Sequence, residues 1–267
     1  QLEDESDPLY SYSYILKEPT KSPLGNDIIS DLTPSLEKLV AEEAVVGNPT
    51  SEQLAEYGFD NPAAAIDYIV NDNEVSLTVG KIDGEYAYLM REGNNAIFKV
   101  KAENVPWATT SEFELRNPLI FVVYLSSIEN IKVTTADGMF EFNRERTLNE
   151  EDTEEYGKNM YDYKTFYNGT EMDSSNFSQF YQVLIGIAKD KFPEGETPSG
   201  AADITIEFEY YDEFNRENTV IELFDVGDRK ALYRLNGVDT MIIKNSYISK
   251  ITSDVQKVIK NEQVTAL

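Results

Sequence analysis

The amino-acid sequence predicts an α+β protein in which mainly antiparallel sheets pack against helices. Dipeptides typical of tight turns separate short apolar runs, and hairpins of this kind join antiparallel neighbours. Longer segments carry apolar residues at intervals of three and four, which is the spacing of one helical face. The chain has 267 residues, of which 41% are hydrophobic, so it is long enough for two lobes of moderate size.

Turn residues define the expected hairpins. Asp83-Gly84, Asp137-Gly138 and Asn236-Gly237 each stand between two runs rich in β-branched and aromatic residues. Such dipeptides favour two-residue turns because both positions tolerate a positive φ. Together with a turn at residues 92–94, they predict strands near 64–70, 74–80, 85–91, 95–100, 131–135, 139–142, 203–211, 218–225, 230–235 and 238–244.

Helical periodicity predicts three long helices, over residues 26–45, 174–191 and 246–261. Pro34 lies inside the first of them, and proline removes a helical hydrogen bond. A break, or a late start near Thr33, is therefore expected there.

Three shorter segments complete the expected structure. A short helix is predicted over residues 51–57, after Pro49. The acidic segment 149–155 is expected to form an exposed loop, and the apolar run 118–125 suits a buried strand.

The order of the expected elements repeats along the chain. A long helix is followed by four strands in each half, with matched elements about 144 residues apart. We therefore expect two similar α+β lobes, 10–127 and 128–267, each with one long helix on a mainly antiparallel sheet.

Several short segments resemble a known family. Residues 54–62 read Leu-Ala-Glu-Tyr-Gly-Phe-Asp-Asn-Pro, and residues 77–80 read Leu-Thr-Val-Gly. With residues 14–19, 115–119 and 128–131, they resemble domain-of-unknown-function family 4340 of bacteria over most of residues 10–145. The sequence departs from the family pattern at Phe59, where Leu is more usual, and at Tyr14, where Trp is common.

The resemblance implies a location and a type of protein. Members of this family carry an N-terminal membrane segment or lipid anchor, as a lipoprotein does, with the domain outside the cytoplasm. Some are encoded beside transporter-like components of gliding or export machinery. No enzymatic activity is established for the family, so the resemblance supplies no catalytic residues.

Composition excludes several classes of function. The sequence contains no Cys and no His, which removes thiol nucleophiles, Cys/His zinc sites and Ser-His-Asp triads. The formal net charge is −26, and a surface so acidic repels nucleic acid and anionic lipid. No apolar run is long enough to insert into a membrane.

Few patterns suggest chemistry, and each has a simpler structural interpretation. Ser35-Leu36-Glu37-Lys38 matches the Ser-x-x-Lys pattern without its companion motifs. The acidic residues 150–155 and 71–74 lack the spacing of a calcium loop, so at most weak Ca²⁺ binding is expected. The strand tyrosines suit sheet packing better than sugar binding. We therefore expect no catalytic, cofactor-binding or metal-ligating residues and no cofactor.

These observations together favour one function and leave two alternatives. The chain begins with Gln1, and we expect an upstream segment that tethers an extracytoplasmic domain to the cell membrane. The favoured function is a non-catalytic interaction module whose partner is another cell-envelope protein, in association with a transporter-like complex. The first alternative is a carbohydrate-binding or carboxylate-based glycan-processing domain, for which two facing carboxylates in a cleft would be expected. The second is a purely structural spacer that holds a membrane machine together.

Overall fold

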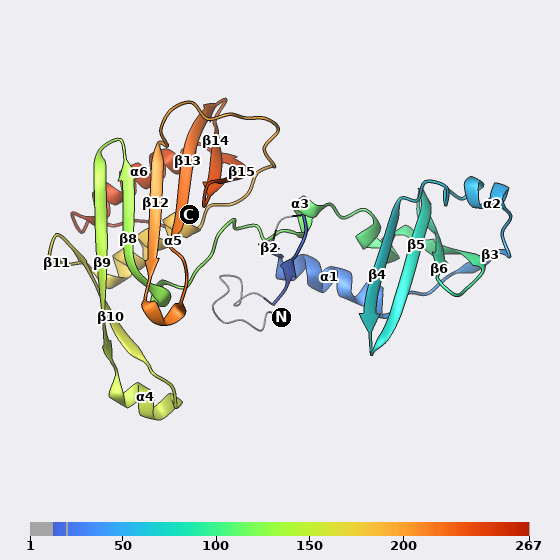
Figure 1. Ribbon diagram of the computed structural model, residues 1–267, viewed down its shortest axis with the longest axis horizontal. Coiled ribbons are helices and arrows are strands. Elements are labelled where there is room, and N and C mark those ends of the chain that lie inside the picture. Colours follow the sequence, from blue (N-terminus) through green and yellow to red (C-terminus); the bar gives the residue numbers. More distant parts are fainter. Residues whose placement is uncertain (1–12, 20, 267) are drawn as a thin grey trace. The chain divides into compact units, whose positions relative to one another are not determined.

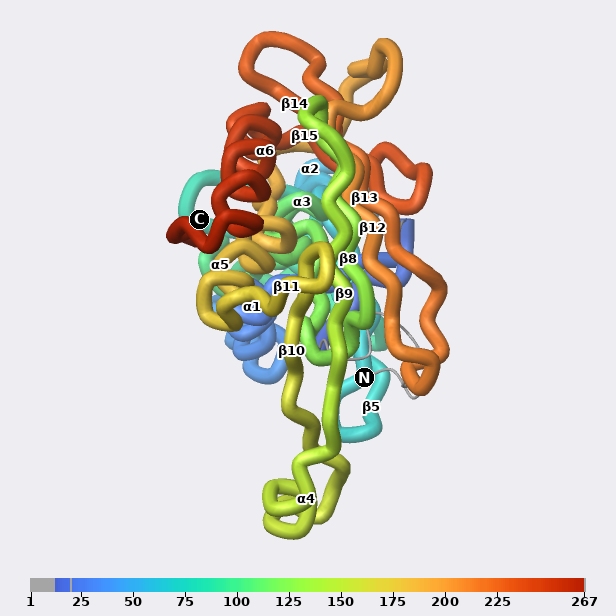
Figure 2. Tube along the Cα trace, turned by 90° about the vertical axis from the view of Figure 1, so that its left-hand side faces the viewer, coloured from blue at the N-terminus to red at the C-terminus, as the bar shows by residue number. Residues whose placement is uncertain are grey.

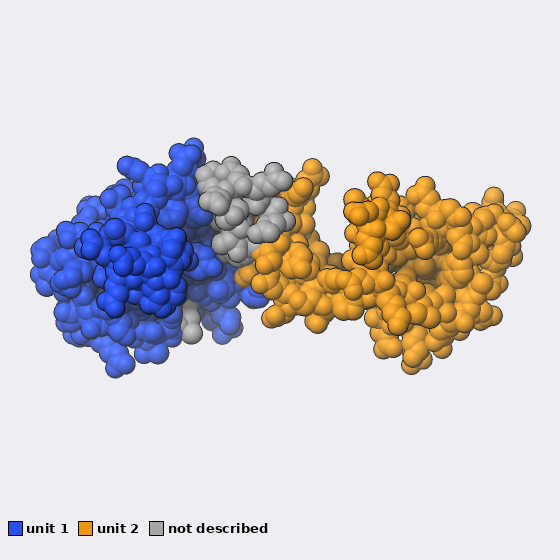
Figure 3. Space-filling view, turned by 90° about the horizontal axis from the view of Figure 1, so that it is seen from below, with its two compact units in different colours: residues 1–12, 118–267 blue, residues 13–117 orange. Residues whose placement is uncertain are grey.

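The chain forms two compact units, which Figure 3 colours separately. The structure is a computed structural model that describes residues 13–19 and 21–266. Unit 2 spans residues 13–117, and the described part of unit 1 spans residues 118–266. The boundary follows Asn117, whereas the sequence analysis drew it between residues 127 and 128. Residues 10–12 of the first expected lobe and the residues around Gln1 lie outside the described residues.

The α+β class with mostly antiparallel sheets is confirmed (Figure 1). Unit 2 holds a five-stranded sheet of order β3-β7-β6-β5-β4 and a two-stranded one, β1-β2. Its elements are β1 (Ile15–Leu16), β2 (Ser22–Pro23), α1 (Asn26–Glu37), β3 (Glu43–Gly47), α2 (Ser51–Glu56), β4 (Ala64–Val70), β5 (Asn73–Asp83), β6 (Tyr86–Arg91), β7 (Ala96–Lys101) and α3 (Glu112–Leu115).

The four strands β4 to β7 form a meander whose turns lie where the sequence predicted them. Asp83 pairs with Tyr86 across a two-residue turn in which Gly84 has φ +61°. At the next turn the backbone N–H of Asn94 donates to the carbonyl of Arg91 over 3.1 Å. Local turn chemistry therefore sets the order of strands in this sheet.

The first long helix differs from the expectation. Helix α1 begins at Asn26 and ends at Glu37, and residues 43–47 form strand β3 instead of continuing it. Pro34 lies within the helix, three residues before its end, so the predicted break near Thr33 is wrong. The helix accommodates Pro34 because only one turn follows it, and the N–H of Lys38 donates to the carbonyl of Pro34 over 3.1 Å.

Unit 1 is built on an eight-stranded antiparallel sheet of order β11-β10-β9-β8-β12-β13-β14-β15. Its elements are β8 (Ile128–Thr135), β9 (Gly138–Leu148), α4 (Glu150–Tyr156), β10 (Tyr161–Tyr167), β11 (Thr170–Glu171), α5 (Ser174–Ile185), β12 (Ile204–Tyr210), β13 (Thr219–Gly227), β14 (Lys230–Leu235), β15 (Val238–Lys244) and α6 (Ser246–Val258). The strands β12 to β15 form a second meander.

Helices α5 and α6 lie side by side on one face of this sheet (Figures 1 and 2). Phe142 of β9 packs against Phe177 and Phe180 of α5, with ring centroids 5.3 and 5.7 Å apart. These rings and the inward residues of β8, β12 and β13 are almost fully removed from solvent. The covered face is therefore the hydrophobic core of unit 1.

Two further segments of unit 1 differ from the expectation. Residues 150–156 form helix α4 at the tip of the long β9–β10 hairpin, not a loop (Figure 2). Asn149 caps the helix by accepting from the N–H of Asp152 over 3.0 Å, and Gly157 ends it with φ +67°. The run 118–125 is not a strand; only Leu119 forms a β-bridge, to Ala188.

The structure does not confirm the expected internal repeat. Each unit has a helix followed later by a four-stranded meander, but the meanders are extended differently. In unit 2 strand β3 joins β7, the last strand of the meander, whereas in unit 1 strand β8 joins β12, the first. Helices α5 and α6 are also shorter than predicted, ending at Ile185 and Val258.

Candidate functional site

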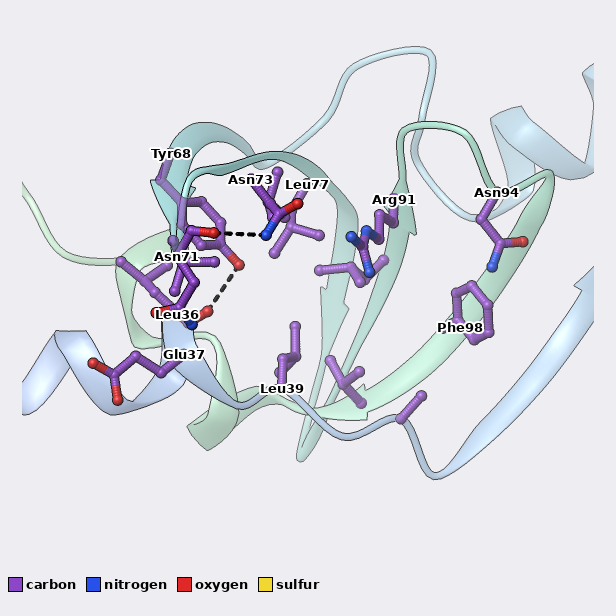
Figure 4. Close-up of a pocket in the computed structure, with 15 residues that line it drawn as sticks. Leu36, Glu37, Leu39, Tyr68, Asn71, Asn73, Leu77, Arg91, Asn94 and Phe98 are labelled. Carbon is purple, nitrogen blue, oxygen red and sulfur yellow. Dashed lines mark hydrogen bonds between the residues drawn. The ribbon is translucent and has the colours of Figure 1, made fainter.

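A pocket of about 460 Å³ lies in unit 2, on one face of the five-stranded sheet (Figure 4). A volume of this size falls in the range of small-molecule and peptide sites. We call it the unit 2 pocket; it is lined by Leu36, Glu37, Leu39, Ala41, Tyr68, Val70, Asn71, Asn73, Val75, Leu77, Leu89, Arg91, Asn94, Phe98 and Val100.

The alternation of side chains along the strands builds the floor of the pocket. Residues two apart on a strand share a face, so Val75 and Leu77 of β5 point the same way. With Leu89 and Val100 they belong to the hydrophobic cluster of unit 2, where each is at most 9% exposed. The floor is thus an apolar surface fixed by sheet backbone.

The end of helix α1 and the residues after it form one wall of the pocket. The hydroxyl of Tyr68 on β4 donates to the carbonyl of Leu36 over 2.9 Å, as Figure 4 shows. Leu39 packs against the same cluster as the floor. This hydrogen bond ties the end of α1 to the sheet, and just beyond the wall the N–H of Glu42 donates to the carbonyl of Lys99 over 2.9 Å.

The rim carries the polar groups of the pocket. Asn71 and Asp72 form the β4–β5 turn with φ +50° and +61°, and the Asn73 amide donates to the carbonyl of Asn71 over 2.8 Å. Asn94, on the β6–β7 turn, is exposed at the other side. Amide groups therefore stand on two sides of an apolar floor.

Arg91 and Glu37 are the charged residues of the lining. The Arg91 guanidinium points over the floor, whereas the Glu37 carboxylate points away from it (Figure 4). Within the described residues Arg91 forms no ion pair. Burial raises the pKa of the Tyr68 hydroxyl, and the positive charge of Arg91 works in the opposite direction. The pocket therefore presents a positive charge beside an apolar floor.

On the opposite side of unit 2, the segment that resembled a family has a structural role. Gly58 ends the turn after α2 with φ +84°, and it lies against Gly80. A side-chain carbon at Gly80 would collide with the carbonyl oxygen of Tyr57 and touch the Phe59 ring. Residues 57–62 and 77–80 therefore meet as packing partners, and only glycine fits at Gly80.

The residues considered for chemistry are placed apart from one another. The hydroxyl of Ser35 donates to the carbonyl of Leu32 over 2.7 Å, within α1, so it is engaged as a helix-end group. Lys38 is the C-cap residue that follows the same helix. The strand tyrosines are divided between the units: Tyr88 lies against Tyr57 with ring centroids 4.7 Å apart and the rings tilted by 55°, Tyr210, Tyr211 and Tyr233 are buried, and Tyr124 is 67% exposed.

Among the described residues, no three Asp or Glu side chains gather as the ligands of a metal ion would. The two facing carboxylates that glycan processing requires are not present in the unit 2 pocket, whose lining has Glu37 alone. No helix of the described chain has the length and apolar composition needed to cross a membrane.

A second charged cluster, in unit 1, is satisfied internally. Arg146 pairs with Glu213 and lies between the rings of Tyr161 and Tyr211, 4.5 and 3.9 Å from their centroids. Hydrogen bonding to Arg146 holds the pKa of the Glu213 carboxyl below its usual value. Because its charges and aromatic faces are already paired, this cluster holds the β9–β10 hairpin on the sheet.

Sequence reasoning did not single out Arg91. One signal was present: in β6 Ala87, Leu89 and Arg91 share one face, so an exposed charge follows two buried apolar residues. The pocket itself had no local signal, because its wall lies in α1 and its floor in β4 to β7.

The comparison with known proteins found one family. Its model, described as "Domain of unknown function (DUF4340)", matches residues 16–193, more than half of the chain. The match contains every residue of the unit 2 pocket and confirms the resemblance drawn from residues 54–62 and 77–80. No curated protein and no solved structure matches the chain.

Proposed function

We propose, from the premise that the chain belongs to the DUF4340 family, that it is a non-catalytic binding module. Its binding site is the unit 2 pocket, and its ligand is a segment of another protein. The family description assigns no activity, so the proposal rests on the pocket and not on a relative.

One observation carries the proposal: part of the inward sheet face of unit 2 is left open as a pocket. Helix α1 has only Leu32 buried, whereas α5 of unit 1 has five buried residues and closes its sheet face. The floor residues are at most 9% exposed, so the accessible apolar surface belongs to half-buried lining residues such as Leu39, Val70 and Phe98. An apolar pocket with polar groups at its rim is typical of a binding site. The unit 2 pocket therefore has the composition that a binding module requires.

The proposed setting is the cell envelope. We propose an extracytoplasmic, membrane-anchored protein whose partner is another envelope protein, in a complex that resembles a transporter. The family resemblance supports this setting. The net charge of −26 keeps a tethered domain soluble and opposes contact with nucleic acid and anionic lipid.

We further propose that the two meanders derive from one repeated unit. Their common order of a helix followed by four antiparallel strands supports this, and the different positions of β3 and β8 are then later additions. A family member whose two meanders align residue by residue would support it, whereas members with only one meander would contradict it.

Cross-linking in native cells tests the binding function. A photo-reactive amino acid replaces Asn94 on the pocket rim, and a control replaces Glu217 in an exposed loop of unit 1. We expect the first position to capture an envelope protein that mass spectrometry identifies, and the control position not to capture it. The capture is expected to disappear when Ala41→Trp, at an exposed residue of the lining, fills the pocket in a chain whose unit 2 still melts cooperatively.

Two outcomes would contradict the proposal. One is capture of cytosolic proteins alone. The other is capture that persists at the same level when the pocket is filled, because the partner would then bind elsewhere.

A further inference from the structure

We infer that the segment bound in the unit 2 pocket carries a carboxylate next to apolar side chains, and that Arg91 receives this carboxylate. The inference rests on the proposed function and names the chemistry of its ligand. The apolar side chains of the segment lie against the half-buried Leu39, Val70 and Phe98, and its backbone faces the amides of the rim.

The positive charge of Arg91 indicates the chemistry of the ligand. Acidic residues outnumber basic ones by 49 to 23 in this chain, so carboxylates are abundant as partners for a guanidinium. Arg116, Arg146 and Arg234 each pair with at least one of them. Arg91 pairs with none within the described residues and points over the pocket floor (Figure 4). A ligand carboxylate is therefore the ion-pair partner of Arg91.

The form of the guanidinium suits a carboxylate, which is the anion that an unmodified peptide carries. The two oxygens of a carboxylate accept two parallel N–H bonds from one arginine, which fixes both position and orientation. Arg91 is exposed, so a ligand carboxylate can reach it from solvent.

The floor requires that the carboxylate be joined to apolar groups. Leu77 pairs directly with Arg91 across β5 and β6, so the guanidinium stem begins beside the apolar cluster. Leu77 and Leu89 are only 5% and 4% exposed, so the apolar surface that a ligand can cover in this pocket comes mainly from the half-buried lining residues Leu39, Val70 and Phe98. Burying this surface stabilises the complex in proportion to the apolar area covered.

The rim favours a peptide over a fatty acid. Asn71, Asn73 and Asn94 line the pocket beside Arg91 and Glu37, so a third of its fifteen lining residues carry an amide or a charge. Peptide N–H and C=O groups need hydrogen-bond partners when they leave water, and side-chain amides provide them. A hydrocarbon chain has no such groups and forms no hydrogen bonds with these amides.

Binding of matched probes to the intact chain tests the inference. The probes are an N-acetylated Leu-Val-Leu tripeptide with a free terminal carboxylate, the same tripeptide as its carboxamide, and dodecanoate. Binding is followed by ¹⁵N-detected chemical shifts at 0.15 M salt, where the Debye length of about 8 Å screens the net charge of the chain. We expect the carboxylate tripeptide to shift residues of the unit 2 pocket and to bind about 10-fold or more tightly than the carboxamide.

Matched arginine variants test whether Arg91 is the residue that binds the carboxylate. Arg91→Gln is expected to abolish the preference for the carboxylate while leaving carboxamide binding unchanged, and Arg91→Lys to retain part of it. Arg229→Gln removes one positive charge from an exposed turn of unit 1, so it is expected to leave the preference intact. Within the described part of the chain the Arg91 side chain forms no hydrogen bond or ion pair, so an unchanged melting temperature is expected and reports that the fold is intact.

Four outcomes would overturn the inference. They are equal binding of carboxylate and carboxamide, an equal effect of Arg229→Gln, tighter binding of dodecanoate than of the tripeptide carboxylate, and no pocket shift with either tripeptide at millimolar concentration. If cross-linking at Asn94 still captures an envelope protein in any of these cases, the binding function stands and only the ligand chemistry is wrong.

Discussion

The two meanders of the molecule have the same strand order but are covered to different extents. In unit 1, strands β12 to β15 lie under α5 and α6, and their inward residues Ile206, Leu223 and Ile243 are fully buried. In unit 2, strands β4 to β7 have only the end of α1 and short segments above them, and a pocket remains. The comparison teaches that a meander is closed into a core or keeps a pocket according to what covers it.

The largest expected effect on stability comes from comparing a leucine in the core of unit 1 with a leucine at the pocket floor of unit 2. Leu184 of α5 is fully buried in unit 1, and Leu89 of β6 is 4% exposed at the floor of the unit 2 pocket. Replacing either by Ala deletes the same atoms. We expect Leu184→Ala to lower the free energy of unfolding toward the upper end of about 2–5 kcal/mol and Leu89→Ala toward the lower end.

The difference arises because the cavity left by Leu184 is closed, whereas the space left by Leu89 opens into the pocket. Denaturant unfolding of both variants, followed by signals assigned to each unit, measures it. A loss at Leu89 equal to or larger than that at Leu184 would show that the pocket floor is packed as tightly as the core.

The next prediction tests whether the turn after α2 stabilises the five-stranded sheet of unit 2 by packing against β5. Gly80→Ala places a carbon against the carbonyl oxygen of Tyr57, so the turn after α2 must move away from β5. We expect a loss of about 1–3 kcal/mol or more in the free energy of unfolding of unit 2, measured by denaturant unfolding. Gly47→Ala in β3 is the control, because nothing lies within 4 Å of its added carbon. Equal losses in the two variants would show that the packing of residues 57–62 against Gly80 does not stabilise unit 2.

A smaller effect is expected at the wall of the pocket. Tyr68→Phe removes the hydrogen bond to the carbonyl of Leu36 and keeps the ring. We expect a loss of about 1 kcal/mol in thermal or denaturant unfolding and faster hydrogen exchange at the end of α1. Tyr124→Phe in unit 1, at a ring that is 67% exposed, is expected to change neither measurement. Unchanged exchange in α1 after Tyr68→Phe would mean that this hydrogen bond does not hold the wall.

The smallest effect concerns the pH dependence of unit 1. Arg146 lowers the pKa of Glu213 below its ordinary value of 4.5, so the pair stabilises the folded state above pH 4.5. This contribution is lost as the pH falls through the lowered pKa of the folded state. Because the Glu213 side chain is 46% exposed, solvent screens the pair and the effect is small.

Glu213→Gln is therefore expected to flatten the fall in the free energy of unfolding between neutral and acidic pH. Urea unfolding of both chains from pH 7 to pH 3 measures it, with Glu217→Gln as the control. An acid-induced loss as steep in Glu213→Gln as in the wild type would exclude a role for this pair.

The fold was predictable where the determinants are local. The Asn236-Gly237 turn, with φ +48° and +80°, joins β14 and β15 at the predicted residues because the dipeptide alone favours it. The prediction failed where neighbours decide the outcome. Residues 150–156 are acidic throughout, but Asn149 and Gly157 cap them into a helix. Pro34 is tolerated because it lies near the end of α1, which periodicity did not locate.

The candidate site was not predictable from the sequence for a related reason. Tyr68 and Leu36 are 32 positions apart, and no local pattern indicates that they meet. The alternation in β6 places Arg91 on an apolar face, but it does not say whether a helix covers that face. Which surfaces remain open is a property of the assembled unit, and it appears only with the three-dimensional structure.

The pairing of β8 with β12 determines where a fragment of this chain can end without breaking the sheet of unit 1. Strand β8 lies inside the matched range, 16–193, and its neighbour β12 lies beyond it, at Ile204–Tyr210. A fragment ending at residue 193 would strip one long edge of β8 and uncover Ile131 and Val133, which are fully buried in the whole chain. The sequence limits of the family are thus not the limits of a folding unit, and we expect such a fragment to self-associate, whereas residues 13–117 keep every strand of their sheet.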